Sequence, residues 1–306
     1  MADVAIIGAG TAGLTAAIYC RRAGMDTVIY EAEAYGGQII NTPEIENYPG
    51  IMNVSGFEFA TRLYEQAAAL GARIEFDKII SIEGDVKSGF TLKGGFGTEE
   101  KCKAVIIASG ARNRHMGIAN EEELTGKGVS YCATCDGSFF KGKTVAVFGG
   151  GNTAVEDAIY LSGICSKVYI IHRREQFRAE SGLVKTLLSK PNVETVLPYV
   201  VKELIRDDRL KGVILENTKD GTDLNLDVDG LFVAIGQIPS SESFKDLVMT
   251  DETGYITAGE NCLTNIPGIF TAGDIRTKKV RQLTTAAADG ATAALAACDL
   301  ISSAGL

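Results

Sequence analysis

Gly8-Ala-Gly-Thr-Ala-Gly13 follows the apolar residues 3–7, and the chain repeats this arrangement at Gly149-Gly-Gly-Asn-Thr-Ala154, after the apolar residues 144–148. In each copy the glycine-rich turn leads into a helical pattern and then into a second apolar strand. Glycine is needed in such turns because it permits the tight turn and lets a pyrophosphate approach the amino terminus of the helix. The repeat therefore predicts two βαβ units, with a first helix over about 14–23, a second helix that ends at about 162, and second strands over 27–30 and 167–171.

The two units differ in the residue that ends the second strand. Glu31 ends it in the first unit, where a carboxylate can accept hydrogen bonds from an adenosine ribose, as in FAD or NAD. In the second unit the strand ends at His172-Arg-Arg174, and Arg178 follows four residues later. Guanidinium groups suit a 2′-phosphate dianion, although a solvated basic patch is an alternative interpretation. The pattern favours NADPH at the second site.

Short alternating strands with glycine or aspartate turns follow each unit, over 79–107 and 200–233. A further strand and turn, Gly268–Asp274, lies beyond the second copy, so we assign it to the first domain. We therefore expect an α/β protein with two Rossmann-like dinucleotide-binding domains, each with a small β-meander, the second inserted into the first. The expected ranges are 1–114 and 244–306 for the first domain and 115–243 for the second.

Cys132 and Cys135 form a CxxC pair just before the second glycine-rich turn. Two such sulfurs can close a small reducible disulfide, and one of them can be held as a thiolate at neutral pH. Zinc is the alternative, but it needs four ligands, and the chain offers only His115 and His172 and no second CxxC. Asp136 follows the pair and can protonate a leaving thiolate, or it can serve only as a turn cap.

The composition narrows the function classes. Lys+Arg 30 against Asp+Glu 39 gives a net charge of −9, which provides no general attraction for nucleic acid or anionic lipid. No secretory signal is visible, and the alanine-rich residues 286–297 are too short to span a bilayer. The seven cysteines then indicate a reducing, cytoplasmic setting in which a CxxC pair is catalytic. The remaining five are expected to be buried apolar side chains, namely Cys20, Cys102, Cys165, Cys262 and Cys298.

Taken together, these residues resemble the low-molecular-weight thioredoxin reductases over essentially the whole chain. The resemblance rests on the two glycine-rich turns and on motifs spread along the sequence: Gly36-Gly-Gln38, Glu46-Asn-Tyr-Pro-Gly50, Cys132-Ala-Thr-Cys-Asp136, His172-Arg-Arg-x-x-Phe-Arg178, Gly273-Asp274 and Arg281-Gln282. The cysteine motif and the HRRxxFR motif are the most specific of these.

The resemblance implies FAD in the first domain and NADPH on the second. The residues implied for FAD are Gly8, Gly10, Gly13, Glu31, Gly36, Gly37, Gln38, Asn47, Gly110, Asp274, Arg281 and Gln282. Those implied for NADPH are Gly149, Gly151, Asn152, Thr153, Ala154, His172, Arg173, Arg174 and Arg178. No metal is expected.

The family also implies how the CxxC pair works. Cys135 would face the flavin, Cys132 would attack the disulfide of thioredoxin or a similar small protein, and Asp136 would donate the proton. The disulfide and the NADPH site share a domain, so both cannot reach the flavin in one pose. In the family, the inserted domain rotates between two poses. A homodimer is implied as well, whereas nucleic acid and membrane partners are not.

Related activities remain alternatives. These are a flavoprotein that takes electrons from ferredoxin, a disulfide reductase or oxidase with another small partner, and a non-enzymatic nucleotide sensor. The first should lack the second phosphate turn and the arginines, and the last would leave the CxxC pair unexplained. Two departures from the family pattern stand out: Leu283 replaces a smaller residue, and the segment from Asp274 to Arg281 is unusually basic.

Overall fold

The computed structural model describes residues 1–304, which form two compact units. The first unit comprises Met1–Arg112 and the chain from Ile238 onward, and the second comprises Asn113–Gln237. The chain passes between them within β7 (Ala111–Asn113) and β16 (Gln237–Pro239), which pair with each other. Each unit is described by itself below.

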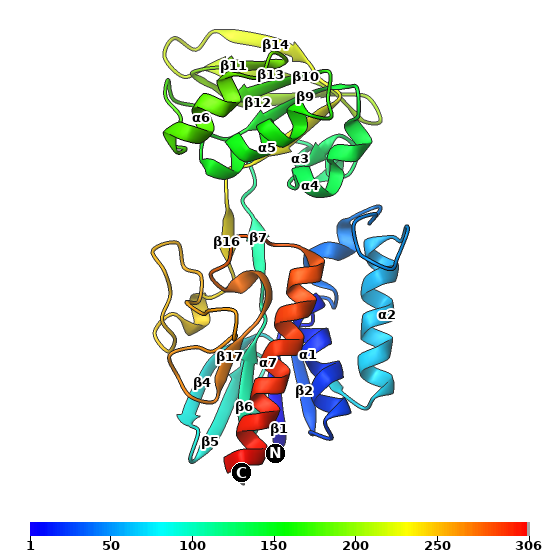
Figure 1. The fold of residues 1–306 in the computed structure, drawn as a ribbon, viewed down its shortest axis with the longest axis vertical. Coiled ribbons are helices and arrows are strands. Elements are labelled where there is room, and N and C mark those ends of the chain that lie inside the picture. Colours follow the sequence, from blue (N-terminus) through cyan, green and yellow to red (C-terminus); the bar gives the residue numbers. More distant parts are fainter. Residues whose placement is uncertain (305–306) are drawn as a thin grey trace. The chain divides into compact units, whose positions relative to one another are not determined.

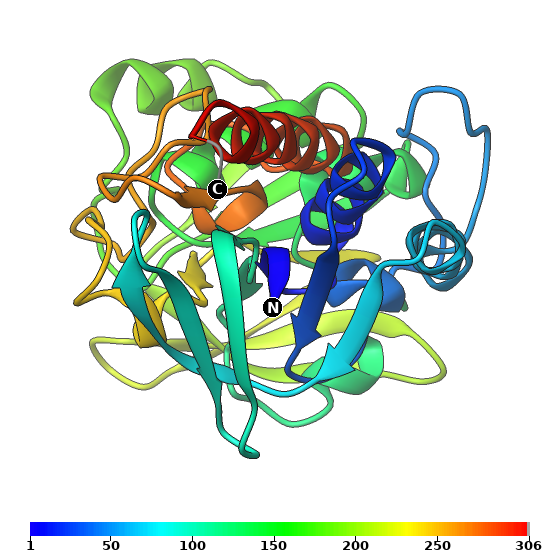
Figure 2. The ribbon, with the colours of Figure 1, turned by 90° about the horizontal axis from the view of Figure 1, so that it is seen from below.

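The first unit is built on one sheet that is parallel at its centre and antiparallel at one side (Figures 1 and 2). Its strands are β1 (Ala2–Ile7), β2 (Thr27–Glu31), β3 (Arg73–Phe76), β4 (Ile79–Asp85), β5 (Gly89–Gly94), β6 (Glu99–Ile107) and β17 (Ile269–Thr271). β1 pairs in parallel with β2 and β6, and β17 pairs in parallel with β6, while β4 and β5 continue from β6 as an antiparallel meander. β1 is apolar except at Asp3, because the residues on both of its faces are otherwise buried.

Three helices complete this unit: α1 (Thr11–Arg22), α2 (Gly56–Ala69) and α7 (Leu283–Ala304). α1 and α7 lie side by side on one face of the sheet, as Figure 2 shows. Small residues make this close packing possible, since a Cβ added at Gly290 of α7 would lie 2.2 Å from the carbonyl oxygen of Ala12 in α1. This packing brings the start of α7 next to the first glycine-rich turn.

The second unit holds a parallel sheet and a separate antiparallel meander. The parallel strands, in sheet order, are β11 (Val193–Val196), β10 (Lys167–Ile171), β9 (Thr144–Phe148), β15 (Gly230–Val233) and β8 (Val129–Ser130). The meander consists of β12 (Tyr199–Arg206), β13 (Leu210–Asn217) and β14 (Asp223–Asp227). Two helices belong to the parallel sheet, α5 (Asn152–Ser162) and α6 (Ser181–Leu188).

The short elements lie at the turns and include the cysteine motif. They are η1 (Gly37–Asn41), α3 (Glu121–Leu124), α4 (Ala133–Asp136), η2 (Gly137–Phe140), η3 (Glu242–Phe244) and η4 (Gly273–Ile275). None of the helices within residues 1–304 is both long enough and apolar enough to cross a membrane.

The predicted fold class is confirmed: two Rossmann-like units carry parallel sheets and β-meanders, and one interrupts the sequence of the other. Two details differ from the sequence pattern. α1 begins at Thr11 rather than near Leu14, because the glycine-rich turn itself supplies the first helical turn. The first meander shares β6 with the parallel sheet, whereas the second forms a sheet of its own.

Candidate functional site

The first glycine-rich turn connects β1 to α1, and two of its glycines are required by the protein's own packing. Gly8 has a φ of +105°, and a Cβ there would lie 2.5 Å from the carbonyl oxygen of Ala108. A Cβ at Gly13 would lie 1.9 Å from the carbonyl oxygen of Gly8. At Gly10 the nearest protein atom to such a Cβ is 4.0 Å away, so open space lies above this residue. The backbone thus leaves room for a phosphate at the start of α1.

Glu31 lies beside this turn at the end of β2. One carboxylate oxygen accepts the backbone N–H of Ala9 at 2.7 Å, and the other accepts that of Glu33 at 3.0 Å. These bonds fix the carboxylate next to the glycine-rich turn. That is the position from which an acidic residue contacts an adenosine ribose in dinucleotide-binding folds.

The segment from Gly36 to Gln38 lies against the same turn. The N–H of Gly36 donates to the carbonyl oxygen of Ala9 at 2.7 Å, and the Gln38 side chain donates to the carbonyl oxygen of Ala111. Gly37 is exposed, and a Cβ there would be 3.6 Å from the Cα of Gly10. Gly110 has a φ of +68° and no protein atom within 4 Å of a Cβ position. These glycines therefore leave the space beside the turn free.

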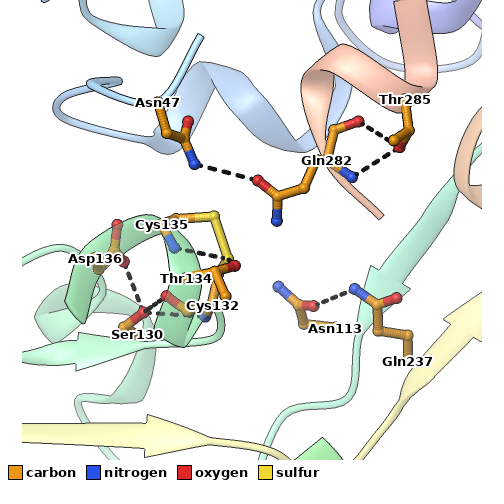
Figure 3. Close-up of a disulfide and its surroundings, with 10 residues drawn as sticks. All are labelled: Asn47, Asn113, Ser130, Cys132, Thr134, Cys135, Asp136, Gln237, Gln282 and Thr285. Carbon is orange, nitrogen blue, oxygen red and sulfur yellow. Dashed lines mark hydrogen bonds between the residues drawn. A yellow bond between two sulfur atoms is a disulfide. The ribbon is translucent and has the colours of Figure 1, made fainter. Parts of the chain in front are cut away.

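Asn47 and Gln282 are far apart in sequence but meet in the structure. The Asn47 amide donates to Oε1 of Gln282 at 3.2 Å (Figure 3). Gln282 lies just before α7, and its N–H donates to Oγ1 of Thr285 at 3.1 Å. Leu283 packs beside the small cluster formed by the buried side chains of Ile45, Val54 and Phe59, which explains the larger residue at this position.

Asp274 lies in the turn η4, close to the amino termini of α1 and α7. A Cβ at Gly273 would lie 2.8 Å from the Cβ of Ala12, so the turn packs directly against the start of α1. Oδ1 of Asp274 is buried and has no hydrogen-bond partner among the described residues. Burial raises the pKa of Asp274, while Lys278 and Arg281 oppose that shift. Arg281 lies over the Tyr255 ring at 4.1 Å.

The second glycine-rich turn connects β9 to α5 and matches the first in its packing. A Cβ at Gly149 would lie 2.2 Å from the carbonyl oxygen of Ala234, which follows β15 just as Ala108 follows β6. Ala154 occupies the position of Gly13, and its Cβ is buried without displacing the turn. Gly151 has open space at its Cβ position, as Gly10 does in the first turn.

Asn152 and Thr153 begin α5, and both are exposed. The Asn152 side chain is engaged with Glu180: its amide donates to Oε1 at 3.1 Å, and its carbonyl oxygen accepts the N–H of Glu180 at 2.9 Å. The side chain of Asn152 therefore links α5 to the start of α6. Its backbone N–H, at the helix amino terminus, is the group suited to a phosphate.

The basic motif follows β10 and folds over the second turn. The N–H of Arg178 donates to the carbonyl oxygen of Gly150 at 2.7 Å, and the His172 ring lies where a Cβ at Gly150 would stand, 2.3 Å away. Burial lowers the pKa of His172, and the charges of Arg178, Arg173 and Arg174 lower it further. The three guanidinium groups are exposed and make no ion pair within residues 1–304, and Nε2 of His172 is buried without a partner there. Positive charge is therefore concentrated beside the turn.

The two cysteines form a disulfide within the second unit, with their Cα atoms 5.3 Å apart (Figure 3). Cys132 caps the amino terminus of α4, and the N–H of Cys135 donates to its sulfur at 3.2 Å. Both cysteines are half-buried, and Thr134 between them is exposed. A donor aimed at one sulfur favours that atom as a thiolate after reduction. Of the two sulfurs, Cys132 Sγ accepts this backbone donor.

Asp136 is half-buried, and its carboxylate accepts a hydrogen bond from Ser130 Oγ at 2.6 Å (Figure 3). Burial raises the pKa of Asp136, and the Ser130 bond opposes that shift. Ser130 also accepts the N–H of Cys132 at 3.1 Å. One hydroxyl group therefore connects the carboxyl group to the backbone of the cysteine pair.

Ser130 was not among the residues singled out from the sequence. It lies six positions before Asp136, and only the turn of the chain between them brings the two side chains together. A second unforeseen contact involves Tyr131, whose hydroxyl group donates to the buried carboxylate of Glu121 at 2.7 Å and lies 3.1 Å from Nδ1 of His115. In the sequence, the only indication of the contact between Ser130 and Asp136 was a small polar residue close to the CxxC motif.

The five remaining cysteines are free and buried, as the sequence indicated. No group of three or more His, Cys, Asp or Glu side chains among residues 1–304 could hold a metal ion.

The residues present fit both cofactors. The open glycine positions at the start of α1, together with the partnerless buried oxygen of Asp274, suit a dinucleotide with a polyhydroxyl chain. The open glycine at the start of α5 and the arginines beside it suit a dinucleotide with an additional phosphate.

Comparison with known proteins supports this interpretation. Residues 2–290 match the family model of the pyridine nucleotide-disulphide oxidoreductases. A thioredoxin reductase of Listeria innocua is 44% identical over 292 residues, which cover 95% of this chain and 91% of the relative. One of Bacillus subtilis is 43% identical over 293 residues, covering 95% and 92%. The crystal structure of thioredoxin reductase from Streptococcus pyogenes, 40% identical, matches with a TM-score of 0.94 over 99% of both chains.

The chain thus belongs to the pyridine nucleotide-disulphide oxidoreductase family of flavoproteins. Within that family it falls among the thioredoxin reductases, and its cofactors are FAD and NADPH.

Proposed function

We propose that this protein reduces the disulfide of thioredoxin with electrons from NADPH, which pass through FAD and the Cys132–Cys135 disulfide. The observation that carries this proposal is a half-buried CxxC disulfide with an adjacent protonatable carboxyl group, on the same unit as a basic dinucleotide turn. NADPH supplies a hydride, and FAD carries two electrons to the disulfide.

We assign FAD to the first unit, where Glu31 would bind the adenosine ribose and the start of α1 the pyrophosphate. Asp274 would accept hydrogen bonds from the ribitol chain. The isoalloxazine end would be contacted by residues near the first glycine-rich turn and the start of α7. These are Gly36, Gly37, Gln38, Asn47, Gly110, Arg281 and Gln282.

We assign NADPH to the second unit. The start of α5, with Gly149, Gly151, Asn152, Thr153 and Ala154, would bind the pyrophosphate through backbone N–H groups. Arg173, Arg174 and Arg178 would pair with the 2′-phosphate, and the neutral His172 ring would support the turn by packing on Gly150. A neutral imidazole is consistent with the lowered pKa of this histidine.

The cysteine pair would act by thiol–disulfide exchange. When two electrons break the Cys132–Cys135 bond, Asp136 supplies a proton to the cysteine pair, and Cys132 remains as a thiolate that the Cys135 N–H stabilises. The Cys132 thiolate attacks one sulfur of the partner's disulfide and releases the other as a thiolate. Cys135 then gives its proton to the thiolate released on the partner and attacks Cys132 Sγ, which frees the reduced partner and closes the disulfide again.

The chain's setting and assembly are also proposed here. Five buried free thiols are consistent with a reducing compartment, so we propose that the protein works in the cytoplasm. We further propose a homodimer on the basis of the family resemblance.

Two cysteine variants test the mechanism. Cys135→Ser should retain a mixed disulfide between Cys132 and thioredoxin, visible as a covalent band that a thiol reductant removes. Cys132→Ser should form no such complex and should not reduce thioredoxin. Thioredoxin reduction by Cys132→Ser at the wild-type rate would refute the mechanism.

Anaerobic titration of the FAD-loaded protein with NADPH tests the electron donor. We expect bleaching of the flavin absorbance by NADPH, followed by its recovery when oxidised thioredoxin is added. Bleaching without recovery, in the presence of several thioredoxins, would instead assign another small disulfide protein as the partner. Failure of NADPH to bleach the flavin would rule out NADPH as the donor.

A further inference from the structure

The basic segment that follows Asp274 surrounds a buried carboxylate on α7. Asp289 is 5% exposed and accepts both arms of the Arg276 guanidinium, Nε at 2.9 Å and Nη2 at 2.8 Å. Nζ of Lys278 donates to the same carboxylate at 2.8 Å. The Arg276 and Lys278 side chains are 2% and 4% exposed. Two cations therefore share one carboxylate in the interior, which leaves one surplus positive charge.

Stability alone is a poor reason for such a cluster. Buried ion pairs often contribute no more than apolar side chains of the same volume, because the charges must be removed from water. Glu260 offers a contrast on the same arginine: it lies 3.3 Å from Nη2 of Arg276, but its side chain is 92% exposed. An exposed partner of this kind contributes little to stability, because water screens the pair. Ion pairing alone therefore does not explain why two cations are buried around Asp289.

A fourth hydrogen bond points to that reason. The N–H of Gly273 donates to Oδ2 of Asp289 at 3.0 Å. Gly273 has a φ of +82°, packs against Ala12 at the start of α1, and directly precedes Asp274. Asp289 therefore fixes the residue that sets the direction of the Asp274 side chain.

The surplus charge acts on Asp274 as well. Burial favours the neutral form of this carboxyl group, and the positive charges of Lys278 and Arg281 oppose it. The Asp289 charge favours the neutral form, so its pairing with Arg276 and Lys278 limits that effect. Oδ1 of Asp274 is buried without a partner among residues 1–304 and is therefore available as an acceptor.

We propose that Asp289 is a positioning residue of the FAD site: through Gly273 it holds the turn that presents Asp274, and it places Lys278 so that Asp274 accepts hydrogen bonds from cofactor hydroxyl groups as a carboxylate. This inference rests on the proposed placement of FAD against Asp274. It assigns a role to buried residues that contact the turn of Asp274.

The test is FAD titration of the apoprotein, followed by quenching of FAD fluorescence. Asp289→Asn should weaken FAD binding by about tenfold or more, as loss of a charge-assisted contact implies. Glu260→Gln is the matched control, because it removes a carboxylate from the same Arg276, and it should bind FAD as the wild type does. Thermal unfolding of each apoprotein checks that the fold is retained.

A double-mutant cycle with Asp274→Ala separates positioning from general destabilisation. If Asp289 acts through Asp274, the double variant should bind FAD no more weakly than the weaker of the two single variants. Additive losses, or wild-type affinity in Asp289→Asn, would overturn the inference. Wild-type affinity in Asp274→Ala would overturn the placement of FAD as well, whereas NADPH-dependent activity of the wild type would still support the proposed function.

Lys278→Met provides the answer if Asp289→Asn does not fold. It removes the surplus charge but retains the Arg276 pair and the Gly273 bond. We expect weaker FAD binding in this variant, and unchanged binding would overturn the role of the buried charge.

Discussion

Asp136 is held between two opposing effects on its pKa. Burial raises the pKa, and the hydrogen bond from Ser130 opposes the rise. A carboxyl group that must give up a proton at neutral pH needs a raised pKa, since an ordinary aspartate is already ionised. At the residue scale, burial and one hydroxyl group therefore act in opposite directions on the pKa of the proposed proton donor.

The first prediction concerns this pair. Asp136→Asn should slow thioredoxin reduction by about 10²–10⁴-fold, the range for loss of a general acid. Ser130→Ala removes the bond that lowers the Asp136 pKa, so that pKa should rise. Because the protonated form is the active one, the decline of kcat/KM toward alkaline pH should move to higher pH in Ser130→Ala and disappear in Asp136→Asn.

Measurement of kcat/KM across pH in the wild type and in both variants tests this prediction. Ser189→Ala is a suitable control, since Ser189 is an exposed serine of the same unit whose hydroxyl group donates to the carbonyl oxygen of Thr186. A profile that is unchanged in Ser130→Ala would show that the hydrogen bond does not tune the acid. Near-normal turnover in Asp136→Asn would exclude Asp136 as the donor.

At the scale of elements, the two glycine-rich turns are built alike, but only the second accommodates a Cβ at its last position. A Cβ at Gly13 would collide with the carbonyl oxygen of Gly8, whereas Ala154 occupies the equivalent place in the second turn. Both turns present the amino terminus of a helix to open space. The chemical difference between the two sites lies outside the turns, in Glu31 at the end of β2 and in the arginines after β10.

The second prediction tests the packing of the first turn. Gly13→Ala should displace the turn and reduce both the stability of the apoprotein and its FAD affinity, because a 1.9 Å contact between Cβ and backbone cannot be accommodated. Gly182→Ala in α6 is the control, since nothing lies within 4 Å of its Cβ position. That change should stabilise the protein by about 0.4–1 kcal/mol. Denaturant unfolding measures both, and a stable, FAD-binding Gly13→Ala protein would contradict the prediction.

The third prediction concerns the loop after β10. Changing Arg173 and Arg174 together to Ala should raise the KM for NADPH and leave that for NADH nearly unchanged. Charge-assisted contacts of about 1.5–3 kcal/mol imply that the preference falls by tenfold or more. Arg209→Ala, at the exposed turn between β12 and β13, is the control for net charge. An unaltered ratio of kcat/KM for the two nucleotides would show that these arginines do not select the phosphate.

At the scale of the whole molecule, the chain leaves the first unit within β7 and returns to it within β16. Each unit has its own parallel sheet and its own buried core. FAD is assigned to the first unit, whereas NADPH and the disulfide are both assigned to the second.

The fourth prediction is that the FAD-loaded protein is a homodimer at micromolar concentration. Light scattering coupled to size exclusion should report about twice the chain mass of 32.4 kDa. Titration to lower concentration should shift the mass only if the dimer dissociates. A mass of one chain across the micromolar range would refute the prediction.

Much of the fold and the site could be predicted from local sequence patterns. The βαβ repeat gave strands at 144–148 and 167–171 that the structure reproduces, because apolar runs and glycine turns are determined by neighbours in sequence. The pairing of Cys132 with Cys135 is local as well, since two intervening residues hold the sulfurs within reach. The acidic and basic ends of the second strands also follow directly from their order in the chain.

Other features depend on the tertiary structure, because their partners come from distant segments. Asn47 meets Gln282 only after α7 packs beside α1, and Ser130 reaches Asp136 only through the fold of the cysteine turn. In the sequence the segment after Asp274 stands out only as unusually basic, whereas in the structure Arg276 and Lys278 are buried against Asp289. The order of charged residues along a chain does not determine which of them are buried. Burial is what allows these side chains to hold the turn of the proposed cofactor site in place.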